Sequence, residues 1–168
     1  MPNYRRFYIA GHPVFVTIVT HRRNPWLASD AKVEELLEAM RWAKTQYPFR
    51  HLAHVILPDH LHWMLLPEDV ERYSELVGAV KRDVTWRLKD TGLTGPFWQA
   101  RFFDHVIRDE DDFGRHLDYV HFNPVRHGYV TRAGDHRRSS FAEWVKRGVY
   151  AADWGSVEPE WIRDLDLE

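Results

Sequence analysis

Hydrophobic residues in the first third of the chain recur at two different spacings. From Val14 to Thr20 they form a short run rich in β-branched residues, which is typical of a buried strand. After Ser29, a suitable N-cap residue, they recur every three or four positions until Pro48, which predicts an amphipathic helix. The chain is therefore expected to begin with a strand followed by a helix.

The middle of the chain predicts a hairpin followed by a second helix. Two apolar runs, residues 51–57 and 60–66, flank a Pro-Asp pair that suits a tight turn, so the runs are expected on adjacent strands. From Asp69 to Leu88 the hydrophobic residues return to helical spacing. This second helix carries several basic residues in its later half.

The remaining pattern adds a fourth strand and a third helix. Residues 101–109 form a further strand-like run, and residues 110–123 have helical spacing. Because Pro124 disfavours helix at the residue before it, we expect this helix to end at Asn123. The order of elements predicts an α+β fold of the split βαβ type, an antiparallel sheet with helices on one face. The other face is then available for binding.

The composition limits the chain to one globular domain. Its 168 residues, 44% of them hydrophobic, can bury roughly two thirds of the unfolded surface around one core. No apolar run approaches the ~18 residues that span a bilayer, and the N-terminus lacks a secretory signal, which favours a cytoplasmic protein. Since there is no cysteine, any metal ion would be held by histidine, carboxylate, amide or water.

Charge is unevenly distributed, although the net charge of the chain is only −2. Residues 151–168 hold six acidic residues and one arginine, whereas residues 1–150 carry a net charge of +3. We therefore expect one mildly basic domain over residues 1–150 and an acidic tail over residues 151–168, which leaves room for a polyanionic partner. The tail would either occupy a basic groove or lie solvated, with its tryptophans packed on the body.

Two histidines stand at the start of the second hairpin strand, in the stretch "LPDHLHWMLL". Side chains two apart on a strand share a face, so His60 and His62 lie side by side while Leu61 points away. Such a pair can hold a metal ion. However, about 0.65 pairs at this spacing are expected by chance, so hydrogen bonds to loop carbonyls explain the pair alone equally well.

Tyr119 and Asn123 are four residues apart on the third helix and project from one stripe, away from the apolar stripe of the same helix. If this stripe lies over the hairpin, Asn123 adds a third ligand to the two histidines. Two imidazoles and an amide leave positions for water and a substrate oxygen, as in catalytic metal sites. Tyr119 would then attack phosphorus. It would need the help of the metal ion, because a tyrosine with a pKa of about 10 is mostly protonated at neutral pH. The simpler alternative is a core tyrosine with its hydroxyl at the rim.

Taken together, these motifs resemble those of a known enzyme family. "LPDHLHWMLLP" resembles the histidine, bulky hydrophobic, histidine motif of the single-tyrosine HUH transposases, and "YVHFNPVRHGYV" resembles their tyrosine helix. "GPFWQARFFDHVIRDEDDF" and "YRRFYIAGHPVFVTIVTHRR" are similar to one branch, the REP-associated tyrosine transposases, which act on repetitive extragenic palindromes. The resemblance covers residues 4–130.

The resemblance implies a ferredoxin-like sheet and metal-dependent cleavage and joining of single-stranded, hairpin-forming DNA through a 5′-phosphotyrosine intermediate. It implies that His60, His62 and Asn123 are metal ligands and that Tyr119 is the nucleophile. Tyr129, beyond the helix, is a rival nucleophile.

The ion would be Mg²⁺ or Mn²⁺, because phosphate oxygens suit hard ions and two imidazoles favour manganese. A structural zinc site would need a fourth protein ligand, which the sequence does not offer. The expected partners are single-stranded DNA hairpins of the palindromes, at the nucleoid, and no association with a membrane is expected. The protein would act as a monomer or homodimer.

Basic and aromatic residues are candidates for contacts with the DNA strand. Backbone phosphates suit arginine and lysine, and unpaired bases stack on aromatic rings. The candidates for phosphate contacts are Arg5, Arg6, Lys81, Arg82, Arg101 and Arg126. Trp98 is the candidate for base stacking because it follows a loop, whereas Phe102 and Phe103 suit the core better. Each of these residues, taken alone, is explained as simply by a solvated charge or a core ring.

Two other functions fit the same residues. An antiparallel sheet with exposed aromatic residues also serves single-stranded RNA recognition without catalysis, and the histidines would then be incidental. A small metallohydrolase would use the histidines to activate water on a low-molecular-weight substrate. A covalent protein–DNA adduct distinguishes the transposase from both.

Overall fold

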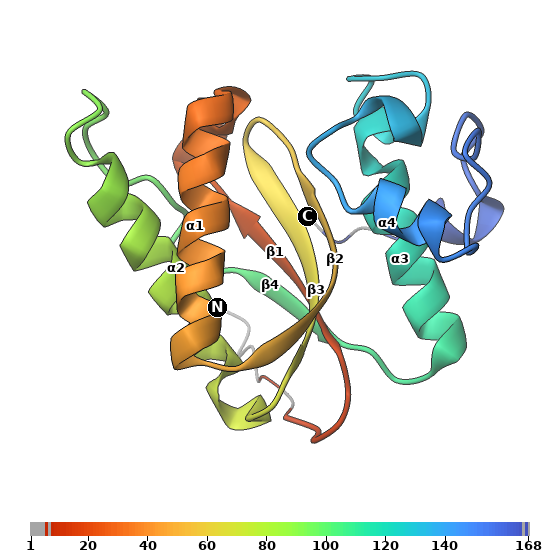
Figure 1. Ribbon diagram of the computed structural model, residues 1–168, viewed down its shortest axis with the longest axis horizontal. Coiled ribbons are helices and arrows are strands. Elements are labelled where there is room, and N and C mark those ends of the chain that lie inside the picture. Colours follow the sequence, from red (N-terminus) through yellow and green to blue (C-terminus); the bar gives the residue numbers. More distant parts are fainter. Residues whose placement is uncertain (1–5, 7, 166, 168) are drawn as a thin grey trace.

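The computed structural model describes Arg6, residues 8–165 and Leu167. Its centre is a four-stranded sheet in the order β2-β3-β1-β4 (Figure 1), formed by β1 (Val14–Val19), β2 (Phe49–Ile56), β3 (His60–Pro67) and β4 (Phe103–Val106). All neighbouring strands are antiparallel. The predicted antiparallel α+β architecture is therefore confirmed. Strand β4 is shorter than the run of residues 101–109 from which it was predicted.

Two helices, α1 (Asp30–Gln46) and α2 (Tyr73–Leu88), cover one face of the sheet (Figure 1). Their hydrophobic residues at helical spacing form one buried cluster with the side chains of that face. Helix α2 begins later than its pattern predicts, because Asp69 caps a 3-10 turn, Val70–Arg72, by accepting a backbone N–H bond. The helix follows this turn directly.

A third helix, α3 (Glu110–Arg126), lies against the opposite face of the sheet (Figure 1) and belongs to a second buried cluster. This face is therefore covered, and the open binding face that the sequence suggested is absent from the described residues. Strand β1 is buried on both faces, which explains why its residues form a continuous apolar run without alternation.

Helix α3 is well capped at its start and continues past a proline at its end. Asp109 accepts a hydrogen bond from the backbone N–H of Asp112 at 2.8 Å. The predicted end at Asn123 is wrong, because the helix runs through Pro124 to Arg126. Pro124 removes one backbone donor from the helix, but the carbonyls of Asn123, Pro124 and Val125 still accept bonds from the residues that follow. The helix is thus continuous through both candidate site residues.

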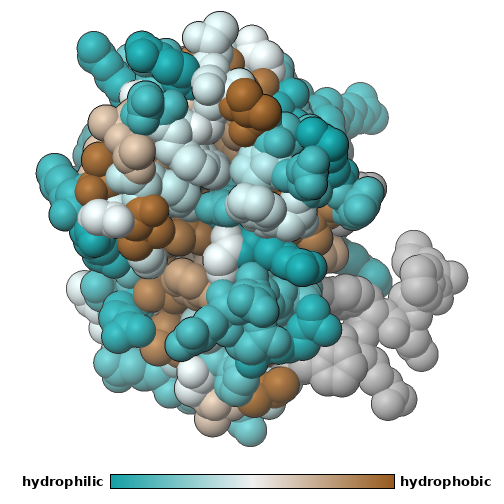
Figure 2. All heavy atoms as spheres, turned by 90° about the vertical axis from the view of Figure 1, so that its right-hand side faces the viewer, coloured by the Kyte–Doolittle hydropathy of each residue, from teal (hydrophilic) through white to brown (hydrophobic). Residues whose placement is uncertain are grey.

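The C-terminal segment, described over residues 127–165 and at Leu167, packs on α3 and contains a short α-helix, α4 (Phe141–Lys146), and two 3-10 turns, Ala133–Asp135 and Glu160–Ile162. The described part of the acidic tail is not a solvated end, because Ile162 and Leu167 are buried in the cluster around α3 and Trp154 stacks on Phe141. Figure 2 shows this side of the molecule, where hydrophobic side chains surface in separate places among hydrophilic ones. Among the described residues, no helix is long and apolar enough to cross a membrane.

Candidate metal and nucleophile site

His60 and His62 open strand β3, where they pair with Val19 and Thr17 of β1. Their ring centroids lie 5.0 Å apart, with the ring planes at 77°. The Nε2 atoms of both rings are buried. The side-by-side arrangement that the spacing predicted is present, on the face of the sheet that α3 covers.

Hydrogen bonds determine which nitrogen of each ring carries the proton. The Nδ1 of His60 lies 2.6 Å from a carboxylate oxygen of Asp59, to which it donates. The hydroxyl of Thr17 gives its one proton to the carbonyl of Leu167 at 2.6 Å, so it must accept the Nδ1–H of His62 at 2.8 Å. Each ring therefore keeps its lone pair on Nε2, the arrangement of metal-binding histidines whose other nitrogen is held by an acceptor.

Asp59 is the anchor of the His60 ring. Burial raises the pKa of Asp59, but the hydrogen bond and charge of His60, together with those of Arg23, outweigh burial and lower the pKa overall. Arg23 contributes through an ion pair of 3.2 Å with the second carboxylate oxygen. The carboxylate is therefore ionised at neutral pH and fixes the orientation of His60.

Helix α3 presents one stripe of side chains to this histidine pair. The ring of Tyr119 meets His62 edge-on, with centroids 5.2 Å apart, and the ring of His127 lies 5.1 Å from His60. Asn123 lies midway between them along the helix, and both atoms of its amide are buried without a hydrogen-bond partner among the described residues. A buried amide in this state is costly, so its oxygen suits a ligand role.

The C-terminal segment closes the site from the solvent. The guanidinium of Arg126 lies 5.5 Å from the centroid of the Tyr119 ring. The same group donates to the carbonyls of Ile162 and Leu165, at 3.4 and 3.2 Å. Tyr119 itself is only 1% exposed and shares its buried cluster with Ile162 and Leu167 of this segment.

Comparisons with known proteins show the family of the chain. No protein-family model matches the chain. The REP-associated tyrosine transposase of Escherichia coli (strain K12) is 36% identical over 155 residues, which cover 92% of this chain and 91% of that protein. A relative from Haemophilus influenzae that carries the same family name is 36% identical over 170 residues, 92% of this chain and 94% of its own. The chain belongs to the REP-associated tyrosine transposases.

A solved structure of this family, described as the REP-associated tyrosine transposase bound to a REP hairpin, has the same fold. It matches with a TM-score of 0.86 and 34% identity, over 99% of this chain and 96% of that one. The likeness to REP-associated tyrosine transposases therefore extends beyond residues 4–130, where the sequence motifs end. It includes the C-terminal segment that covers the site.

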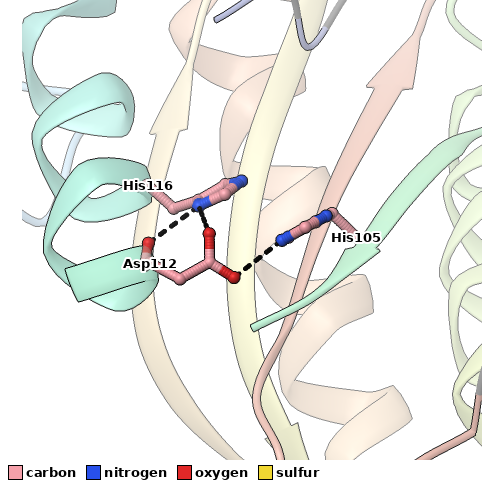
Figure 3. A group of neighbouring side chains, drawn as sticks. All are labelled: His105, Asp112 and His116. Atoms are coloured by element: carbon pink, nitrogen blue, oxygen red, sulfur yellow. Dashed lines mark hydrogen bonds and ion pairs between the residues drawn. The ribbon is translucent and has the colours of Figure 1, made fainter. Parts of the chain in front are cut away.

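This member of the family has a second polar group, formed by His105 from β4 and by Asp112 and His116 from α3 (Figure 3). One carboxylate oxygen of Asp112 lies 2.8 Å from the Nε2 of His105, and the other lies 3.1 Å from the Nδ1 of His116. The ligand atoms lie within 4.8 Å of one another, as a metal site requires. However, the two rings are nearly parallel, at 10°, and stacked with centroids 4.5 Å apart, so their in-plane lone pairs do not converge on one ion.

The charges of this second group favour a hydrogen-bonded network. Burial raises the pKa of Asp112, but hydrogen bonds from His105 and from the backbone of Arg108 lower it to about 2. Burial lowers the pKa of His116. At neutral pH an ionised Asp112 therefore accepts bonds from its neighbours. The spacing of Asp112 and His116 was a visible signal, but only the packing of α3 beside β4 brings His105 to them.

The basic residues proposed to bind DNA lie in different surroundings. Arg5 lies outside the described residues. Arg6 forms an ion pair with Asp104 at 3.0 Å, and Lys81 donates to the carbonyl of Gln99 at 2.7 Å. The other candidates, Arg82, Arg101 and Arg126, are exposed. Arg126 also donates hydrogen bonds to the C-terminal segment. Among the described candidates, Arg82 and Arg101 are therefore placed to meet a phosphate without rearrangement, whereas Arg126 must first leave the C-terminal segment.

The aromatic candidates are mostly buried. Trp98 is 8% exposed, packs edge-on against Trp26 and donates its indole N–H to the carbonyl of Lys81. It is a core residue in this structure and does not present a ring to a base. Phe102 and Phe103 are half-buried. The rival nucleophile Tyr129 lies after α3, half exposed, and stacks on His127 with centroids 6.1 Å apart.

Proposed function

We propose that the protein cleaves and rejoins single-stranded, hairpin-forming DNA at repetitive extragenic palindromes, with Tyr119 as the nucleophile. The contact of Tyr119 with His62, 5.2 Å between ring centroids, is the observation that carries this proposal. It places a phenol beside a predicted metal ligand on the helix that also carries Asn123. A solved relative is described as bound to a REP hairpin, which supports the same class of DNA for this chain.

His60, His62 and Asn123 would hold a divalent ion, Mg²⁺ or Mn²⁺. The fit is supported by the two Nε2 lone pairs and by the buried Asn123 amide, which has no partner among the described residues. HUH transposases are in general metal-dependent. The chemistry that the ion supplies when bound is polarisation of the phosphate and stabilisation of charge on the displaced oxygen.

In the cleavage step, the Oη of Tyr119 loses its proton and forms a bond to phosphorus, while the bond from phosphorus to the 3′ oxygen breaks and that oxygen takes up a proton. The 5′ end remains attached as a phosphotyrosine. Attack by a 3′ hydroxyl reverses these bond changes and regenerates Tyr119. Because the phosphodiester energy is stored in the intermediate, rejoining needs no nucleotide cofactor. Arg126, once released from the C-terminal segment, would bind a backbone phosphate.

The proposed organisation is a catalytic domain over residues 1–150 with an acidic C-terminal tail over residues 151–168. The proposed setting is the cytoplasm, at the nucleoid, where the DNA substrate is found. The proposed active form is a monomer or homodimer.

The test is the substitution Tyr119→Phe, which removes one oxygen and keeps the ring packed on His62. With a DNA hairpin and Mn²⁺, the wild type should give a covalent adduct that survives denaturing electrophoresis, whereas Tyr119→Phe should bind the hairpin and give none. Tyr129→Phe is the matched control and should retain the adduct. An adduct formed by Tyr119→Phe and lost in Tyr129→Phe would transfer the role to Tyr129.

A further inference from the structure

We propose that His105, Asp112 and His116, here named the α3 clasp, set the angle of α3 on the sheet and thereby place Tyr119 for reaction. This inference rests on the proposed function. The three residues would act as positioning residues, since none of them contacts the DNA or the reacting oxygen in the proposed mechanism.

The clasp braces the corner between strand β4 and helix α3. Strand β4 ends at Val106 and α3 begins at Glu110, so only three residues connect them. His105, before the corner, lies 2.8 Å from the carboxylate of Asp112, after it. The same carboxylate oxygen accepts the backbone N–H of Arg108, within the corner, at 2.9 Å. One carboxylate therefore holds the strand, the connection and the first turn of the helix together.

The clasp and the candidate site lie on the same side of α3. Asp112, His116, Tyr119 and Asn123 follow one another at spacings of four, three and four residues, which places them on one helical stripe. All four side chains are buried. A rotation or tilt of the helix at Asp112 is therefore transmitted directly to Tyr119.

Phe15 of strand β1 joins the clasp to the site through ring contacts. It is opposite His105 in the strand register. Its ring centroid lies 5.1 Å from His116, 5.4 Å from His62 and 6.1 Å from Tyr119. A shift of His116 against the Phe15 ring would therefore change the positions of both His62 and Tyr119.

The lever arm gives the expected size of the effect. Seven residues of helix separate Asp112 from Tyr119, a distance of about 10 Å along the axis. A tilt of about 5° at the clasp would therefore move Tyr119 by about 1 Å, and a misplacement of about 1 Å can cost on the order of 100-fold in rate. The effect should fall on the chemical step and leave DNA binding nearly unchanged.

Other side-chain hydrogen bonds that hold α3 are made with the C-terminal segment. Asp118 accepts bonds from Tyr150 at 2.7 Å and from Trp161 at 2.8 Å, both of which belong to the C-terminal segment. The clasp instead joins α3 to the sheet itself. It can therefore keep the helix in place while the C-terminal segment opens for DNA.

The test compares His105→Ala with His105→Gln, whose amide N–H stands in for the Nε2–H that reaches Asp112. We expect His105→Ala to lower the single-turnover rate of adduct formation at saturating hairpin by about 30-fold, with the dissociation constant within about threefold of wild type. His105→Gln should restore the rate to within about threefold. Arg115→Ala, an exposed change on the same helix, is the matched control and should leave both values unchanged.

The second variant pair is His116→Ala with His116→Asn, whose amide replaces the Nδ1–H, and melting temperatures are measured for all variants. The proposal is overturned if His105→Ala cleaves at the wild-type rate, if the Gln and Asn variants are as slow as the Ala variants, or if rate and binding fall together with the melting temperature. A wild type that forms no adduct overturns the proposed function and this inference together. An adduct that needs Tyr119 but not His105 overturns this inference alone.

Discussion

The closed C-terminal segment predicts that a short truncation activates the protein. The charge pattern alone would place the cut after Tyr150, but that cut also removes the fully buried Ile162 and the packed Trp154. Deleting residues 164–168 removes only the final stretch, whose carbonyl at Leu167 accepts the Thr17 hydroxyl beside the site. The cut should open the path to Tyr119 while leaving the core of the segment in place.

The magnitude follows from the contacts that the stretch makes. Burial of the Leu167 side chain contributes about 2 kcal/mol. The bonds from Thr17 to the Leu167 carbonyl and from Arg126 to the Leu165 carbonyl contribute about 1 kcal/mol each. Ordering the three described residues of the stretch, Asp164, Leu165 and Leu167, costs about 1 kcal/mol each, which cancels most of these gains. The closed state is therefore favoured by at most about 2 kcal/mol, so truncation should raise adduct formation about 3- to 30-fold.

The assay is single-turnover adduct formation with hairpin DNA below saturation, with the dissociation constant measured in parallel by gel shift. The control is a full-length variant that removes the acidic charge of the stretch without shortening it: Asp164→Asn, Asp166→Asn and Glu168→Gln combined. If steric closure is the cause, only the truncation accelerates the reaction. If charge is the cause, the neutral variant binds DNA more tightly at low salt. An unchanged or slower reaction in a folded truncation would refute the reasoning.

Three further predictions concern the metal ligands and acid stability. His62→Ala should abolish Mn²⁺ binding in titration calorimetry while His116→Asn keeps the affinity within about threefold; the reverse result would move the ion to the α3 clasp. Asp59→Asn should weaken Mn²⁺ binding by about 10- to 100-fold, because His60 loses its carboxylate anchor, and an unchanged affinity would contradict the assigned tautomer. Burial, with the charge of neighbouring histidines, lowers the pKa of His54 and His121 to about 3. Between pH 6.5 and 3 the unfolded chain therefore binds protons that the folded chain does not, so stability is full above pH 6.5 and is lost as the pH falls. The free energy of unfolding should drop by about 1.4 kcal/mol per pH unit for each ring. Denaturant unfolding at several pH values should show a shallower slope for His121→Asn.

Local spacing along the chain was enough to predict most of the elements and which candidate site residues share a face. A period of two places His60 and His62 on one face of a strand, and a spacing of four places Tyr119 and Asn123 on one stripe of a helix. These relations depend only on the backbone geometry of a strand or a helix, so they do not depend on how the rest of the chain packs. The order of strands and helices followed from the same periodicities.

Where the pattern failed, a contact from elsewhere in the fold decided the outcome. Trp98 follows a loop and suggested an exposed ring, but Trp26 and the carbonyl of Lys81 hold it in the core. Pro124 suggested a helix end, but it falls in the last turn, where the following residues still complete the backbone bonds. Propensity acts over a few residues, and packing can override it.

Only the tertiary structure determined what surrounds the site. Sequence spacing tells which residues share a face but not which distant face meets it, because no periodicity links positions far apart in the chain. The bond from Thr17 to Leu167 joins residues 150 positions apart, and His105 meets Asp112 only because α3 lies beside β4. The sequence by itself therefore determined which candidate groups share a face, while the packing of α3 and the C-terminal segment decided their orientation and surroundings.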